Sequence, residues 1–187
     1  ISRAIQIVVI VELDPTISPR PSLIDGRWNE SHYSLDPADA AAISTARSIA
    51  YAATVPARII VVGAGPYRAA KIMEQALAAG AHEAIHVLTD DRTIAPEPTA
   101  RALARAIESH CRAPDLMLTR QLPATGTMGL LGMLVARDLG LQFLPNAHSV
   151  AVRFTEDEAS VAVWSGDRKK PQRLSLLDAR LARRGRI

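Results

Sequence analysis

The sequence predicts an α/β protein with three layers, in which helices cover both faces of a mostly parallel sheet and an antiparallel β appendage follows. Two observations lead to this prediction. Short apolar runs rich in β-branched residues alternate with segments of helical spacing along residues 1–145, whereas the residues after Pro145 alternate between polar and apolar. Strands that alternate with helices form right-handed βαβ units, so the expected architecture is Rossmann-like α/β/α.

The first unit begins with the continuous apolar run Ile5 to Leu13, which is typical of a strand buried on both faces. Residues 14–35 are polar and rich in proline, and Asp25-Gly26 lies between apolar residues as a hairpin turn would. Asp36-Pro37 supplies an N-cap and a first-turn proline. A helix from there to about Ala53 is therefore predicted.

The second unit repeats this pattern. Arg58 to Val62 is predicted to be a buried strand, Gly63-Ala64-Gly65-Pro66 a tight turn, and Arg68 to Ala79 a helix closed by Gly80. Further elements are expected in the same order: strand 84–88, helix 98–110, strand 116–119, and helix 125–139 ended by Gly140.

Beyond Pro145, residues 148–154 and 159–164 alternate around a polar turn at 155–158, which predicts an antiparallel hairpin. A third segment, 172–177, can add to it after a turn at Gly166-Asp167. We therefore expect one domain over residues 1–187, with a βα core at 1–145 and a β hairpin and basic tail at 146–187.

Composition excludes several classes of protein. The 187 residues are 48% hydrophobic and 22% charged, which suits a globular chain with a real core. No apolar run reaches the roughly 18 residues of a membrane span, so no membrane association and a cytoplasmic location are expected. The single cysteine, Cys111, excludes an internal disulfide. The late basic residues lack interleaved aromatic residues, which favours a solvated or partner-docking tail over nucleic-acid binding.

A ligand of such a fold binds outside the carboxyl ends of the strands, which directs attention to segments 11–14, 34–38, 63–66 and 120–127. Glycines after a strand let backbone amides approach a phosphate, although Gly63 to Pro66 also fits a strand-to-helix turn with no ligand. Arg120-Gln121 leads into Thr125-Gly126-Thr127, which suits either a phosphate site or an ordinary helix cap. The GxGxxG fingerprint is absent, since Ala69 stands in the place of its third glycine.

No pattern in the sequence indicates a catalytic or metal site. The five histidines are scattered, and His82 and His86 straddle a predicted turn and strand rather than one helix face. Asp90-Asp91 fits a solvated turn, and no nucleophile stands at a recognisable spacing from a base. A ligand-binding fold without acid–base equipment predicts a carrier rather than an enzyme.

Four stretches of sequence together carry a family resemblance. They are Ser34-Leu35-Asp36-Pro37, the run Ile59 to Pro66, the stretch Gln75 to Ala81 followed by Ala84 to Val87, and Asp115 to Leu118 with Gln121 and Thr125-Gly126. These resemble the β subunit of electron-transfer flavoproteins, within the adenine-nucleotide α-hydrolase-like superfamily. The resemblance implies a heterodimer with an α subunit that holds most of the FAD, a bound AMP, and electrons passed from a donor dehydrogenase to a downstream acceptor.

The resemblance also implies cofactor contacts, and the residues at the strand ends add to them. The expected cofactor-binding residues are Ile10, Asp36, Ala38, Ala64, Gly65, Arg120, Gln121, Thr125, Gly126 and Thr127. The chain departs from the family in that Glu12-Leu13 replaces a basic pair, Ala38 an aromatic residue, and Leu122-Pro123-Ala124 an acidic segment. AMP binding weaker than in typical members is therefore predicted.

A different class of function stays open at this stage. A universal-stress-type module with the same layers would bind an adenine nucleotide as a homodimer. The sequence lacks the glycine-rich phosphate loop that such a module carries in its last βα turn. A flavoprotein subunit is therefore the favoured interpretation.

Overall fold

The computed structural model describes residues 4–13, 23–24, 27–28, 33–89, 95–111, 114–120, 130–145, 147–154, 159–165 and 172–175. Four strands form a parallel sheet in the order β5-β4-β1-β6. Their bounds are β1 (Ile5–Ile10), β4 (Ala57–Gly65), β5 (Glu83–Leu88) and β6 (Leu116–Thr119). The predicted strands at 84–88 and 116–119 are confirmed to within one residue.

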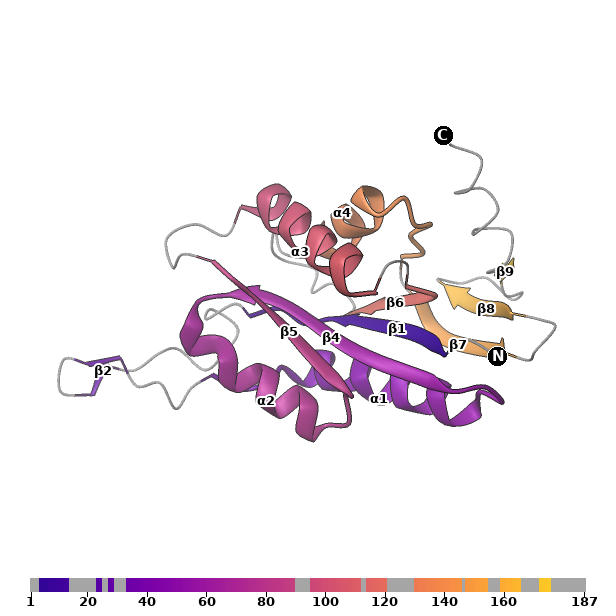
Figure 1. Cartoon of the computed structure of the whole chain (residues 1–187), viewed down its shortest axis with the longest axis horizontal. Coiled ribbons are helices and arrows are strands. Elements are labelled where there is room, and N and C mark those ends of the chain that lie inside the picture. The colour runs from indigo at the N-terminus through magenta and orange to yellow at the C-terminus, as the bar shows by residue number, and fades with distance from the viewer. Residues whose placement is uncertain are drawn as a thin grey trace.

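Helices cover both faces of this sheet (Figure 1). α1 (Pro37–Ala52) and α2 (Ala70–Ala78) share one apolar core with Ile7 and Val9 of β1. α3 (Pro96–Cys111) and α4 (Leu131–Asp138) share the other with Val8 and Ile10. Successive side chains of β1 thus enter opposite cores, which is why the strand is apolar throughout. The predicted three-layer α/β/α fold class is confirmed.

The order of the strands creates one reversal in the sheet. From β1 the chain passes through α1 to β4 and through α2 to β5, and then returns to place β6 on the other side of β1. Helices that follow β1 and helices that follow β5 therefore lie on opposite faces. In such sheets the crevice outside the carboxyl ends of the two strands at the reversal is where ligands bind. Here these strands are β1 and β6.

Capping residues set the ends of the helices much as predicted. The Asp36 Oδ1 atom accepts a hydrogen bond of 2.7 Å from the Ala38 N–H, and Pro37 opens α1. Gly80 (φ 113°) and Gly140 (φ 62°) adopt the left-handed backbone that closes α2 and α4. A 3₁₀ turn, η2 (Tyr67–Ala69), precedes α2. Residues 125–129 of the predicted last helix lie outside the described residues.

The predicted tight turn at residues 63–66 is wrong, because β4 continues through Gly65. Gly63 pairs with His86 and Gly65 with Leu88 of β5, and neither glycine has a positive φ. A Cβ atom at Gly65 would lie 2.7 Å from the Leu13 Cβ atom, and one at Gly63 would lie 3.0 Å from Leu13 Cγ. The two glycines therefore serve close packing beneath Leu13 rather than a turn.

Two antiparallel sheets complete the described structure. β2 (Leu23–Ile24) pairs with β3 (Arg27–Trp28), which confirms the predicted hairpin. β7 (Ala147–Phe154), β8 (Ala159–Ser165) and β9 (Gln172–Ser175) form a sheet in that order, at the right of Figure 1. Val150 and Val152 of β7 pack against the core that α1 shares. The turns predicted at 155–158 and 166–167 lie outside the described residues.

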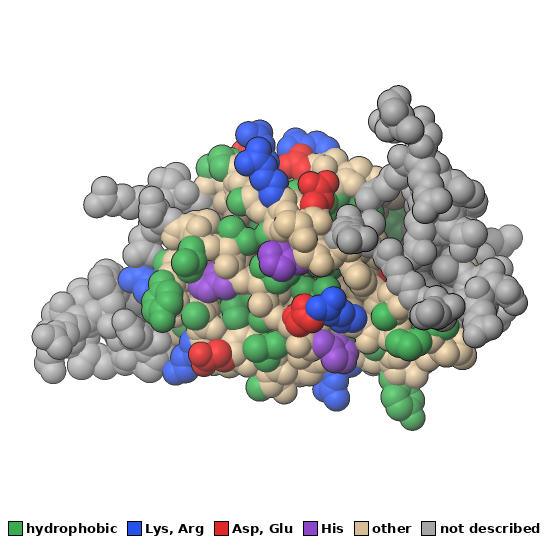
Figure 2. All heavy atoms as spheres, viewed as in Figure 1, with side chains coloured by type: hydrophobic (Ala, Val, Ile, Leu, Met, Phe, Trp, Pro, Cys, Tyr) green, Lys and Arg blue, Asp and Glu red, His purple; other side chains and the backbone are tan. Residues whose placement is uncertain are grey.

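The surface and the remaining core add two observations. Figure 2 shows basic and acidic side chains together over α3 and α4, where Arg101, Arg105 and Arg137 are exposed. Arg137 pairs there with Asp138 of the same helix. Cys111 is buried at the end of α3, consistent with a packing role.

Among the described residues, no helix has the length and apolar character that a membrane crossing requires.

We predict that Gly65→Ala lowers the free energy of unfolding by about 1 to 3 kcal/mol, because the added methyl group overpacks against Leu13. Leu13→Gly removes the whole side chain that the methyl group meets, including the Cβ atom at 2.7 Å. In the double variant the cost of Gly65→Ala should therefore shrink to a few tenths of a kcal/mol. Urea denaturation of the four proteins measures this coupling. Strict additivity would contradict the packing role assigned to Gly65.

Candidate functional site

A buried ion pair joins the two strands at the reversal of the sheet. Glu12 lies two residues beyond β1 and Arg120 directly beyond β6. Glu12 Oε2 contacts Arg120 Nη2, and the two side chains are 3% and 5% exposed. Such burial removes both charges from water, so each depends on the other for its stability. The pair stands where the fold places a ligand.

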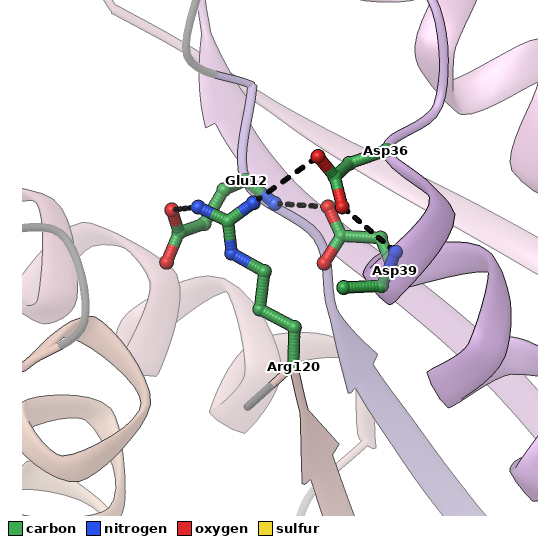
Figure 3. A network of polar contacts seen from close by, with 5 residues as sticks. Glu12, Asp36, Asp39 and Arg120 are labelled. Atoms are coloured by element: carbon green, nitrogen blue, oxygen red, sulfur yellow. Dashed lines mark hydrogen bonds and ion pairs between the residues drawn. The ribbon is translucent and has the colours of Figure 1, made fainter. Parts of the chain in front are cut away.

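The first turn of α1 adds two carboxyl groups to this ion pair, as Figure 3 shows. Asp36 Oδ2 lies 3.7 Å from Arg120 Nη1, while the other Asp36 oxygen caps the helix. Asp39 Oδ2 accepts a hydrogen bond of 3.1 Å from the Glu12 N–H. Carboxylates at a helix N-terminus also gain from the positive end of the helix dipole. We call Glu12, Asp36, Asp39 and Arg120 the switch-point cluster.

Negative groups outnumber positive groups in this cluster, since Glu12 and Asp36 pair with the one guanidinium and Asp39, bound to the Glu12 N–H, adds a third carboxyl group. Two of its buried polar atoms, Arg120 Nε and Asp39 Oδ1, have no hydrogen-bond partner within the described part of the chain. The guanidinium already has Glu12 and Asp36 as its anionic partners. An incoming phosphate would compete with both.

Burial raises the pKa of the Asp39 carboxyl to about 7, because removal from water disfavours its charged form. The positive charge of Arg120 and the hydrogen bond from Glu12 N–H act in the opposite direction. The carboxylates of Glu12 and Asp36 raise the pKa further. Asp39 therefore changes protonation near neutral pH, and its proton reduces the excess of negative charge in the cluster.

The segment 11–13 also covers the glycines of β4. Val11 continues the pairing of β1 through a hydrogen bond of 3.0 Å from its N–H to the Val62 carbonyl oxygen. Leu13 is fully buried, and it occupies the space that side chains at Gly63 and Gly65 would otherwise fill. The approach to the β4 backbone that glycines could offer a nucleotide is thus taken by the chain itself.

Two hydrogen bonds with the Gln75 side chain of α2 hold the loop that leads to Asp36. Gln75 Oε1 accepts a hydrogen bond of 2.6 Å from the Leu35 N–H, and Gln75 Nε2 donates one of 3.5 Å to the Tyr33 carbonyl oxygen. The guanidinium of Arg68 lies 5.8 Å from the centre of the Tyr33 ring. These contacts tie residues 33–35 to α2, so that α1 begins with Asp36 facing Arg120.

The structure brings together only part of the predicted set of cofactor-binding residues. Asp36 and Arg120 meet in the switch-point cluster, and Ala38 donates its N–H to Asp36. Ile10 and Ala64 instead pack into the core shared with α3 and α4. Gly65 lies within β4 beneath Leu13. The remaining predicted residues lie outside the described part of the chain: Gln121, Thr125, Gly126 and Thr127.

Sequence reasoning did not assign a site role to Glu12 or Asp39. Glu12 breaks the apolar run at the end of the first strand and lies in the segment 11–14 that the fold class singles out, but nothing local indicates its partner. Asp39 shares the buried face of α1 with Ala42, Ile43 and Ala46. A carboxyl group on an apolar helix face is a signal of a buried partner. That partner is the Glu12 N–H, which only the fold brings alongside α1.

The two histidines considered as a metal pair have structural partners instead. His82 Nδ1 accepts a hydrogen bond of 2.9 Å from the Ile59 N–H, and His86 Nε2 lies 3.0 Å from the Gly65 carbonyl oxygen. Both therefore connect β5 and its approach to β4. Within the described ranges, no group of three or more His, Cys, Asp or Glu side chains is arranged to hold a metal ion. Asp90 and Asp91 lie outside those ranges.

The fold defines a doubly wound α/β domain, and the cluster lies at the carboxyl ends of β1 and β6, where the sheet reverses. Comparison with known proteins gives the family: residues 28–165 match the electron transfer flavoprotein domain. The match covers most of the chain, and the chain therefore belongs to the electron transfer flavoprotein domain family. A comparison with curated proteins gave no match.

We predict that Asp39 makes the stability of the protein fall as pH rises from about 4 to about 7. The folded-state pKa of about 7 exceeds the ordinary value of 3.8, so the folded state binds this proton more tightly. The stabilisation is therefore complete below the ordinary pKa and lost once pH passes the folded one. Asp39→Asn keeps an acceptor for the Glu12 N–H and removes the titration.

Chemical denaturation at about pH 5 and about pH 8 measures the effect. The difference in unfolding free energy between wild type and Asp39→Asn should change by about 2 to 3 kcal/mol, in favour of the variant at the higher pH. Asp138→Asn, at the end of α4, serves as a control and should keep the wild-type slope. Parallel pH profiles for wild type and Asp39→Asn would contradict the assignment.

Proposed function

We propose that this chain is the β subunit of an electron-transfer flavoprotein. In this role it completes an FAD site with an α subunit and carries electrons from donor dehydrogenases to a downstream acceptor. The observation that carries the proposal is the electron transfer flavoprotein domain match over residues 28–165, on a doubly wound sheet. The match favours this function over the universal-stress-type module.

The described residues support a division of labour in which the α subunit holds most of the FAD. A dinucleotide pyrophosphate needs a close approach to backbone amides, usually over glycines. In this chain Leu13 covers Gly63 and Gly65, and Glu12 engages Arg120. These residues do not suit the pyrophosphate of FAD. The flavin would supply the redox chemistry, while the β subunit covers and orients it.

The carboxyl edge of β4 and β5 offers apolar surface for the α subunit. Tyr67, two residues beyond β4, is 81% exposed, and Leu88, at the end of β5, is 63% exposed. Gly65 and Leu88 are partners in the pairing of β4 with β5, so the two exposed side chains lie at the same corner of the sheet. Because a shared cofactor lies at the carboxyl edge, the partner docks beside it on this corner.

AMP is the second ligand in the proposal, at the carboxyl ends of β1 and β6. Arg120, Asp36 and the start of α1 are the described groups that would face it. We propose that it binds more weakly than in typical family members, because the basic pair after the first strand is replaced by Glu12 and Leu13.

The proposed division of labour predicts that the chain purified alone carries no flavin, and that it acquires a flavin absorption spectrum when co-expressed with its α subunit. The physical reason is that Leu13 and Glu12 occupy the places where a pyrophosphate would bind. Absorption spectroscopy after size-exclusion chromatography measures the flavin content of each sample. A stoichiometric flavin on the lone chain would contradict the proposal.

Surface variants test the docking corner in the same co-expression experiment. Tyr67→Ser with Leu88→Ser should weaken the heterodimer at least about tenfold, since the buried core of an interface carries most of its binding energy. Tyr51→Ser removes an equally exposed tyrosine, 94% exposed near the end of α1 at the opposite edge of the sheet. It should leave the heterodimer intact. Equal losses from the two changes would contradict the assigned corner.

A further inference from the structure

The switch point of this sheet is already occupied by the chain itself. Glu12 takes the position of an anion beside the Arg120 guanidinium, and Leu13 takes the space over Gly63 and Gly65. Val11 anchors both by continuing the pairing of β1 with β4. Consecutive residues thus lie beside the arginine that could meet a nucleotide phosphate and against the β4 backbone that glycines would otherwise leave open.

The negative charge of the switch-point cluster disfavours a ligand that carries a phosphate more than it disfavours a neutral ligand. A phosphate that approached Arg120 would meet the carboxyl groups of Glu12 and Asp36, which pair with the guanidinium, and that of Asp39 at the Glu12 N–H. Like charges at such distances repel strongly when they are shielded from water. The Glu12 side chain is 3% exposed, so solvent screens this repulsion poorly. A neutral ligand pays no such electrostatic cost.

We propose that Glu12 is a specificity-determining residue that keeps nucleotide phosphates away from Arg120, and that Leu13 excludes the nucleoside from the glycines of β4. The inference rests on the switch point being the nucleotide-facing edge in the proposed function, and it gives the physical cause of weak AMP binding. It concerns the lone chain. Flavin binding with the α subunit is measured separately, so either proposal can fail without the other.

The test measures binding of AMP and of inorganic phosphate to the lone chain by isothermal titration calorimetry, at fixed ionic strength. Glu12→Gln preserves the size of the side chain and removes its charge. It should bind both probes at least about fivefold more tightly than wild type does. Glu83→Gln is the matched control, because it removes a carboxylate from the half-exposed pair with Arg58 on β4 and β5. It should leave both affinities unchanged.

A variant that combines Glu12→Gln with Arg120→Gln tests whether the gain in affinity comes from Arg120. If Glu12 acts by neutralising Arg120, the gain of Glu12→Gln should vanish when Arg120→Gln is added. Sub-micromolar AMP binding by wild type would overturn the inference. It would also be overturned if Glu12→Gln gained less than about fivefold over Glu83→Gln, or if the gain persisted without Arg120.

Leu13→Ala tests the second half of the inference and also covers a failure of Glu12→Gln to fold, which circular dichroism would reveal. This variant keeps the ion pair and opens the space over Gly63, where the Leu13 Cγ and Cδ1 atoms lie. Adenosine should then bind more tightly than to wild type by at least about fivefold, whereas the affinity for inorganic phosphate should not change. An unchanged adenosine affinity, or an equal gain for inorganic phosphate, would overturn the role given to Leu13.

Discussion

The buried ion pair between Glu12 and Arg120 is the interaction on which the arrangement of the ligand edge depends. It joins the ends of β1 and β6, the two strands between which the chain reverses direction across the sheet. A buried charge without its partner is strongly destabilising, so each of these residues fixes the position of the other. Asp36 and Asp39 then orient the first turn of α1 against the pair. The hydrogen bonds of the Gln75 side chain of α2 with residues 33–35 support that orientation.

The same interaction relates the fold to the function. The chain belongs to the electron transfer flavoprotein domain family, and the sheet order provides the usual ligand edge of a doubly wound domain. At that edge, however, the described residues make contacts with one another. Leu13 lies over the β4 glycines, and Glu12 engages the arginine. This arrangement is the basis of our proposal that the chain completes the cofactor site of a partner and does not itself hold a dinucleotide.

The sequence predicted the fold class and most elements, because periodicity and capping are local signals. The apolar run 5–13, the Asp36-Pro37 start of α1 and the left-handed Gly80 and Gly140 are examples. It misplaced residues 63–65, since a glycine required by close packing looks the same in sequence as a glycine required by a turn. The cluster was only half predicted. Glu12 and Arg120 are 108 positions apart, and only the order of the strands shows that they meet.

A double-mutant cycle on Glu12 and Arg120 tests the central claim most directly. Urea denaturation would give unfolding free energies for wild type, Glu12→Gln, Arg120→Gln and the double variant. The account predicts that each single change costs about 3 kcal/mol or more, and that the double variant recovers at least about 2 kcal/mol of their sum, because it leaves neither Glu12 nor Arg120 as a buried charge without its partner. Costs that add to within about 0.5 kcal/mol would contradict the claim that this pair organises the ligand edge.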